Sequence, residues 1–185
     1  MCSSDLRIKL LASERSVGKT LSFRGETVKV ELLTAEAFAG VDVALFSAGA
    51  SRSKEFAPAA WKSGAVVVDN SSAFRMDPEI PLVVPEINPH AIAQYAKKGI
   101  IANPNCTTIV TLMALAPLYR YSRIRRVVAS SYQAVSGAGA KALEEFKQQV
   151  RAWVKGEPIP VAVFAYQIAF NVIPRIDRFE ANGYT

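Results

Sequence analysis

Residues 41–72 read VDVALFSAGASRSKEFAPAAWKSGAVVVDNSS, and this stretch decides the fold class. Its two apolar runs, 41–47 and 65–69, are short and almost uninterrupted, which is typical of strands buried on both faces of a sheet. Between them, 51–64 has the spacing of a helix that ends at Gly64. A strand, a helix and a second strand in this order predict a parallel sheet in an α/β protein.

The ends and the buried face of this helix can also be predicted. Ser51 or Ser53 is placed to cap its N-terminus, because a serine hydroxyl accepts a hydrogen bond from an unpaired N–H of the first turn. Phe56, Ala59 and Ala60 share one face, which we expect to pack on the sheet.

Further apolar runs on either side extend the pattern. We expect strands at 7–13, 82–84 and 100–102, a hairpin at 21–32 centred on Arg24-Gly25-Glu26, and a short helix or turn at 34–40. Strands alternating with helices predict a doubly wound sheet that is covered on both faces and binds ligands at the carboxyl ends of its strands.

The chain changes character after residue 104, where we place a domain boundary between 1–104 and 105–185. The segment 107–118 is a strongly apolar predicted helix, and 126–133 (RVVASSYQ) a predicted strand. An amphipathic helix is predicted over 138–154, with an apolar stripe of Leu143, Phe146, Val150 and either Trp153 or Val154.

Composition excludes several classes of protein. Half of the 185 residues are apolar and 21% are charged, which excludes a disordered chain. The charge-free stretches 99–119 and 158–174 contain prolines and amides, so we interpret them as buried segments and expect no membrane span. The N-terminal residues have neither a basic nor an apolar region, so no signal peptide is predicted.

The net charge of +6 suits small anionic ligands. The basic cluster at 120–126 lacks the interleaved aromatic residues of a nucleic-acid platform, so we expect no nucleic-acid partner. Two distant cysteines, Cys2 and Cys106, and a single histidine, His90, provide neither a disulfide framework nor a zinc site. This usage of cysteine indicates a reducing, cytoplasmic compartment.

Cys106 is the candidate nucleophile. It follows the apolar run 100–102 and begins the predicted helix, with Asn105 placed to cap it. A helix N-terminus stabilises a thiolate, which would make the sulfur nucleophilic. The alternative is that Cys106 is a small buried apolar residue, as most free cysteines are.

Four other positions are candidates for binding. Arg75 could bind a phosphate or carboxylate through its planar guanidinium, or form a surface ion pair with Asp77 or Glu79. Gln133 could contact a substrate or simply be exposed. Ser136-Gly137 could bring backbone N–H groups to a ligand, or serve as a flexible connector.

The loop after the first strand bears on the choice of cofactor. If 7–13 is the second strand of a dinucleotide fold, Arg15 and Ser16 would accommodate the 2′-phosphate of NADP, whereas Glu14 would favour NAD. His90 is interpreted as a structural or surface residue.

Taken together, the motifs resemble those of the aspartate-β-semialdehyde dehydrogenase family. The resemblance is carried by LLASERS (10–16), LFSAG (45–49), VDNSSAFR (68–75), VVPE (83–86), NPNCTTI (103–109), YQAVSGAG (132–139) and QIAFNVIP (167–174). It implies an NADP-binding Rossmann-type domain over 1–104, truncated at its start, and the beginning of an α+β catalytic and dimerisation domain over 105–185.

The resemblance also implies a reaction. NADPH would reduce β-aspartyl phosphate to aspartate semialdehyde with release of phosphate, on the route to lysine, threonine and methionine. Cys106 would form the thioester, and Gln133 would orient it. Arg75 and Asn105 would hold the phosphate, Arg15 and Ser16 the 2′-phosphate of NADP, and Ser136 and Gly137 the nicotinamide end. Members of this family are homo-oligomers.

Some motifs of the family are not found in this sequence. Its glycine-rich loop would precede Leu6, and its acid/base histidine, a substrate-binding arginine and a phosphate-binding lysine would follow Thr185. We therefore expect a fragment with little or no turnover. The alternatives are a reductase of N-acetyl-γ-glutamyl phosphate, a non-catalytic binding or assembly module, and a gene-model remnant.

Overall fold

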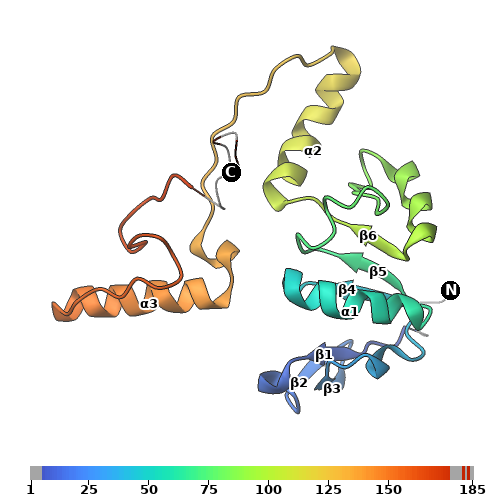
Figure 1. Ribbon diagram of the computed structural model, residues 1–185, viewed down its shortest axis with the longest axis horizontal. Coiled ribbons are helices and arrows are strands. Elements are labelled where there is room, and N and C mark those ends of the chain that lie inside the picture. Colours follow the sequence, from blue (N-terminus) through green and yellow to red (C-terminus); the bar gives the residue numbers. More distant parts are fainter. Residues whose placement is uncertain (1–5, 176–180, 182, 184–185) are drawn as a thin grey trace. The chain divides into compact units, whose positions relative to one another are not determined.

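A computed structural model describes residues 6–175, 181 and 183, arranged in two compact units, 1–127 and 128–185. Cys2 lies outside the described residues. The first unit contains two three-stranded sheets, and the second is built around one helix (Figure 1). The predicted α/β class is confirmed.

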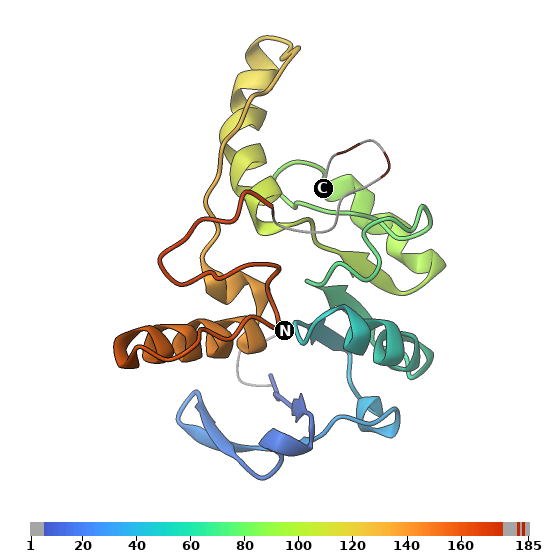
Figure 2. The same ribbon diagram turned by 60° about the vertical axis from the view of Figure 1, so that its left-hand side comes forward.

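The first sheet has the strand order β1-β3-β2. Strand β1 (Leu10–Ala12) pairs in parallel with β3 (Glu26–Leu32), and β2 (Thr20–Phe23) forms the predicted antiparallel hairpin with β3. Arg24 and Gly25 turn this hairpin with φ values of 51° and 83°, a conformation that glycine adopts without strain. Figure 2 shows the hairpin from a second direction.

The second sheet is wholly parallel, in the order β4-β5-β6. Its strands are β4 (Val43–Phe46), β5 (Val66–Asp69) and β6 (Ile100–Ala102). Phe46 pairs with Asp69 and Asp69 with Ala102, so the three strands end together at one edge. The loops after these strands are thereby brought to the same side of the sheet.

The prediction of a strand at 82–84 is wrong, because only Leu82 forms a bridge, to Ala102. The chain turns directly afterwards: Asn88 accepts a hydrogen bond from the Val84 N–H at 2.9 Å and donates one to the Leu82 carbonyl at 3.0 Å. Pro85 lacks the N–H that a longer strand would need. The nine-residue 3₁₀ helix η4 (Pro89–Lys97), which the sequence did not indicate, then leads into β6.

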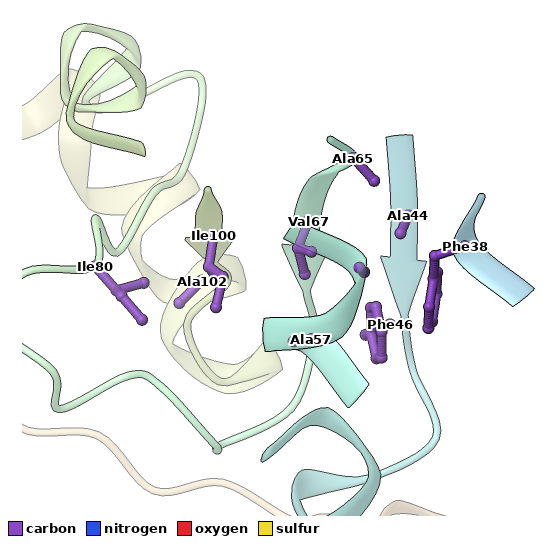
Figure 3. Packing of buried hydrophobic residues seen from close by; sticks show 10 residues of the cluster. Phe38, Ala44, Phe46, Ala57, Ala65, Val67, Ile80, Ile100 and Ala102 are labelled. Atoms are coloured by element: carbon purple, nitrogen blue, oxygen red, sulfur yellow. The ribbon is translucent and has the colours of Figure 1, made fainter. Parts of the chain in front are cut away.

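Helix α1 (Ala50–Lys62) packs on one face of the second sheet. Figure 3 shows the core, in which Phe38 of η3 (Glu36–Phe38) stacks on Phe46 with ring centroids 5.7 Å apart. On the opposite face, Val43 and Leu45 are 57% and 79% exposed. The expectation that both faces would be covered is therefore wrong for β4 among the described residues.

The predicted capping of α1 is also wrong. Gly49, with φ 92°, occupies the N-cap position, and no side chain caps the helix. Ser53 is fully buried instead, and its hydroxyl donates to Asp69 at 2.7 Å. The predicted face is only partly correct, because Ala60 is buried while Phe56 and Ala59 are half-buried. Ala57, which was not predicted, is fully buried.

The first unit ends with helix α2 (Cys106–Tyr121), which extends the predicted helix by one residue at its start and three at its end. Beyond it, residues 122–134 have no regular secondary structure, so the strand predicted at 126–133 is wrong. Val127 and Val128 are 52% and 81% exposed. An apolar run forms a strand only when a neighbouring strand pairs its backbone, and none of the described residues does so here.

In the second unit, 3₁₀ helix η5 (Val135–Ala138) precedes helix α3 (Ala140–Lys155). The amphipathic helix was predicted correctly, but its buried face was not. Of the predicted stripe, Leu143, Phe146 and Val150 are half-buried, while Trp153 and Val154 are exposed. The fully buried positions are Ala142, Glu145, Gln149 and Ala152.

Two polar side chains are buried because they bind the backbone that runs beside α3 (Figures 1 and 2). Glu145 accepts from the N–H groups of Ala162, Val163 and Phe164. Gln149 accepts from the N–H groups of Ile168 and Ala169, each at 2.9 Å, and donates to the Pro160 carbonyl at 2.8 Å. Hydrogen bonds to a segment distant in sequence, rather than the apolar stripe, therefore determine which face of α3 is buried.

Candidate functional site

Cys106 is the first residue of α2, immediately beyond the carboxyl end of β6. Asn105 caps the helix as predicted, since its side-chain oxygen accepts from the Thr107 N–H at 2.9 Å. Cys106 is a free, exposed cysteine. The exposure rules out the alternative that it is a small buried apolar residue and leaves its sulfur accessible to a substrate.

Arg75 is held against the same loop. Its Nε donates to the Asn103 carbonyl at 2.8 Å, and Nη2 donates to the Asn70 carbonyl at 3.2 Å. These two bonds use two of the five N–H donors of a guanidinium group. Arg75 is therefore anchored to the backbone two residues before Asn105, with further donors for an anion.

The alternative of an ion pair between Arg75 and Asp77 or Glu79 is wrong. Lys98, which the sequence did not indicate, lies 2.9 Å from a carboxylate oxygen of each. The hydrogen bond from Lys98 and then that from the Glu79 N–H lower the pKa of Asp77, and those to Glu79 and Asp77 raise the pKa of Lys98. Lys98 thus pairs with both acids, and Arg75 pairs with the Asn103 and Asn70 carbonyls instead.

Asp69 organises the loops at this edge. It is fully buried and accepts from the Ser53 hydroxyl at 2.7 Å and from the Ser71 hydroxyl at 2.8 Å. It also accepts from the Ser71 N–H at 3.0 Å, and its backbone carbonyl accepts from the Asn103 N–H at 2.9 Å. Asp69 thus joins α1, the loop that leads to Arg75 and the loop that leads to Cys106. The sequence contains a signal for this role, because Asp69 ends an apolar run and is followed by serines.

Arg15 and Ser16 lie in the short 3₁₀ helix η2 (Glu14–Ser16), directly after β1. A pocket of about 440 Å³ opens beside it, and the residues that line it are Ser13, Glu14, Arg15, Leu32, Leu33 and Arg52. Ser16 is half-buried and is not one of these lining residues. The lining thus combines two arginines, a residue type that binds anions, with two leucines.

Gln133, Ser136 and Gly137 belong to the second unit and are all exposed. The structure brings Gln133 and Gly137 together, because a Cβ atom added at position 137 would lie 2.8 Å from the Gln133 side-chain Cδ. Glycine at 137 therefore lets the Gln133 amide lie over the backbone. Gly139, with φ 92°, is the N-cap of α3.

The described residues contain no cluster of three His, Cys, Asp or Glu side chains suited to a metal ion. His90 is exposed in η4. Within the same residues, every helix is too short or too polar to cross a lipid bilayer.

Two family descriptions match the chain in succession. "Semialdehyde dehydrogenase, NAD binding domain" matches residues 6–95, and "Semialdehyde dehydrogenase, dimerisation domain" matches residues 115–185.

Individual proteins agree with these matches. Aspartate-semialdehyde dehydrogenase of Aquifex aeolicus is 58% identical over 178 residues, which are 95% of this chain and 52% of that protein. The crystal structure of aspartate semialdehyde dehydrogenase II from Vibrio cholerae, complexed with ASA, is 50% identical with a TM-score of 0.88, over 96% of this chain and 53% of that one. The enzyme of Candida albicans with NADP is 26% identical with a TM-score of 0.50, over 63% and 40% of the two chains. The chain spans about half the length of the curated relatives it matches.

Proposed function

Because the chain belongs to the semialdehyde dehydrogenase family, we propose that it carries the acyl-transfer chemistry of an aspartate-semialdehyde dehydrogenase. The substrate would be β-aspartyl phosphate, reduced with NADPH to aspartate semialdehyde and phosphate. The observation that carries the proposal is the exposed Cys106 at the start of α2, with Arg75 hydrogen-bonded to the loop before it.

Cys106 acts as the nucleophile in this proposal. Its thiolate forms a bond to the acyl carbon, and the bond between that carbon and the phosphate oxygen breaks, so phosphate leaves with the electron pair. The resulting thioester accepts hydride more readily than a carboxylate, because sulfur donates little electron density to the carbonyl. Bound NADPH supplies that hydride. Loss of the C–S bond then returns Cys106 to its thiolate.

The neighbouring residues bind and orient the substrate. Arg75 and Asn105, the N-cap of α2, hold the phosphate: Arg75 has N–H donors beyond the two used by the Asn103 and Asn70 carbonyls. Gln133 orients the acyl intermediate. Ser136 and Gly137 approach the nicotinamide end through their backbone N–H groups.

Arg15 and Ser16 contact the 2′-phosphate of NADP in this proposal. Support comes from the position of Arg15 beside a pocket at the end of β1, where dinucleotide folds bind the adenosine ribose. We further propose that the protein works in the cytoplasm as a homo-oligomer assembled through 115–185, the region matched by the dimerisation domain.

The proposal is tested by the release of phosphate from β-aspartyl phosphate. We expect a burst that approaches one phosphate per chain, above the spontaneous hydrolysis measured without protein, and its loss in Cys106→Ser. The longer N-acetyl-γ-glutamyl phosphate should give a smaller burst. A burst that survives in Cys106→Ser contradicts the proposal, and one that is larger with the longer substrate favours the reductase alternative.

A further inference from the structure

The pocket beside η2 contains a second arginine that the sequence did not indicate. Ser13, Glu14 and Arg15 come from the loop after β1, and Leu32 and Leu33 from the end of β3 and the residue after it. Arg52 comes from the first turn of α1, 37 positions after Arg15 in the sequence. The fold thus brings two arginine residues to one pocket.

We propose that Arg52 is a second 2′-phosphate-binding residue and helps to select a nucleotide that carries this group. The inference rests on the proposed function, in which Arg15 contacts NADP. A phosphate monoester has nearly two negative charges and three acceptor oxygens near neutral pH, more than one guanidinium group neutralises. Two arginines that line one pocket can bind different oxygens of the same phosphate.

The state of each arginine is consistent with this role. Among the described residues, the Arg15 side chain takes part in no recorded hydrogen bond or ion pair, so its donors face solvent. Arg52 contacts Glu55 at 3.2 Å, but the two side chains are 46% and 57% exposed. An exposed ion pair of this kind contributes little stability. Arg52 can therefore exchange Glu55 for a phosphate at small cost.

Two carboxylates oppose the binding of an anion here. Glu14 lines the pocket itself, and Glu55 holds Arg52 through its ion pair. A carboxylate at the end of this strand suits a free ribose hydroxyl, whereas a phosphate is repelled by it. We infer that the second arginine offsets Glu14, which otherwise favours NAD.

The test uses the full chain and measures binding of 2′,5′-ADP and of 5′-AMP by calorimetry at one fixed ionic strength. These probes differ only in the 2′-phosphate. We expect the unmodified chain to bind 2′,5′-ADP more tightly. Arg52→Ala should weaken that binding roughly tenfold or more, as expected for a lost charge-assisted hydrogen bond. It should leave 5′-AMP within about twofold of the unmodified chain, because the remaining contacts are shared.

Two further variants distinguish a direct contact between Arg52 and the 2′-phosphate from a general effect of positive charge on nucleotide binding. Lys54→Ala removes the same charge from the exposed side of α1, at a residue that does not line the pocket, and should change neither affinity more than about twofold. Glu55→Gln frees Arg52 and should tighten binding of 2′,5′-ADP severalfold. Circular dichroism checks that each variant is folded.

The inference is overturned if Arg52→Ala binds 2′,5′-ADP as tightly as the unmodified chain, or no worse than Lys54→Ala does. If Arg15→Ala alone loses affinity, the NADP assignment stands and only the role of Arg52 is lost. If the unmodified chain does not distinguish the two probes, the pocket does not select the 2′-phosphate. Phosphate release at Cys106 decides the proposed acyl chemistry separately in every case.

Discussion

Asp69 is the residue whose loss should disturb the first unit most directly. Replacing it with alanine leaves the buried Ser53 and Ser71 without their shared acceptor, and unsatisfied buried groups are costly. We expect Asp69→Ala to lower the free energy of unfolding by about 2–4 kcal/mol, measured from urea unfolding followed by circular dichroism. The control Asp42→Ala, at an exposed position before β4, should change it by no more than about 0.5 kcal/mol. Equal effects of the two substitutions would contradict this account of Asp69.

Glu145 is a buried carboxylate that stabilises the second unit, as Asp69 stabilises the first. Its contribution to the free energy of unfolding depends on pH. Burial, the largest single influence, raises its pKa, but the N–H groups of Val163, Phe164 and Ala162 together lower it further than burial raises it. The pKa in the folded state is thus below the ordinary 4.5. A carboxyl of this kind contributes stability that is fully present above the unfolded pKa and is lost as the pH falls through the lower folded pKa.

Thermal unfolding of the Glu145→Gln variant tests this. We expect a lower melting temperature at neutral pH and a shallower loss of stability between about pH 5 and pH 3, because the variant has no carboxyl to protonate there. Glu144→Gln removes the same charge from an exposed position of α3 and should follow the unmodified chain. If the melting temperatures of Glu145→Gln and of the unmodified chain fall in parallel as the pH is lowered, Glu145 does not have the lowered pKa described above.

At the scale of elements, the start of α2 links stability with the candidate site. Asn105→Ala removes the acceptor for the Thr107 N–H and should cost about 1 kcal/mol in urea unfolding. Asn105→Asp keeps an acceptor at the cap and should restore most of that loss. If Asn105→Asp is as destabilised as Asn105→Ala, the cap is not what stabilises this helix.

Elements were predictable where the local pattern and the tertiary pairing agree. The runs that became β4, β5 and β6, the hairpin and the start of α2 follow from apolar runs, a turn and a cap. The strand expected at 126–133 failed because pairing depends on a neighbour that no local pattern reveals. The buried face of α3 was misjudged because Glu145 and Gln149 bind backbone far away in sequence, which hydrophobic spacing does not report.

The contacts around the candidate site residues were predictable only in part. Cys106 and Asn105 follow from a strand, a cap and a helix in succession. Three contacts join residues many positions apart: Arg75 with Asn103, Lys98 with its two acids, and Arg52 with Arg15 in one pocket. Such contacts arise from the sheet order, so the sequence alone did not indicate them.

At the scale of the whole molecule, the chain forms two units joined through exposed backbone without regular structure. Arg123, Arg125 and Arg126 lie in this connection. Limited digestion with trypsin should cut there first and yield two products, since proteases need backbone that is free of helices and sheets. Exposed basic residues within α3, such as Lys147 and Arg151, serve as the internal control. Cleavage in α3 at the same rate would contradict the division into units. The same fragments also test the domain boundary that we place between residues 104 and 105.

The central claim is that Cys106 is the residue that accepts the acyl group, and it is tested most directly by the mass of the protein. The full chain is mixed with β-aspartyl phosphate, quenched in acid and analysed by intact-mass spectrometry and peptide mapping. We predict one added aspartyl group per chain, located on the peptide that contains Cys106, with Cys2 unmodified and no adduct in Cys106→Ser. An adduct on Cys2, an adduct that persists in Cys106→Ser, or an unmodified chain after substrate is consumed would contradict the account.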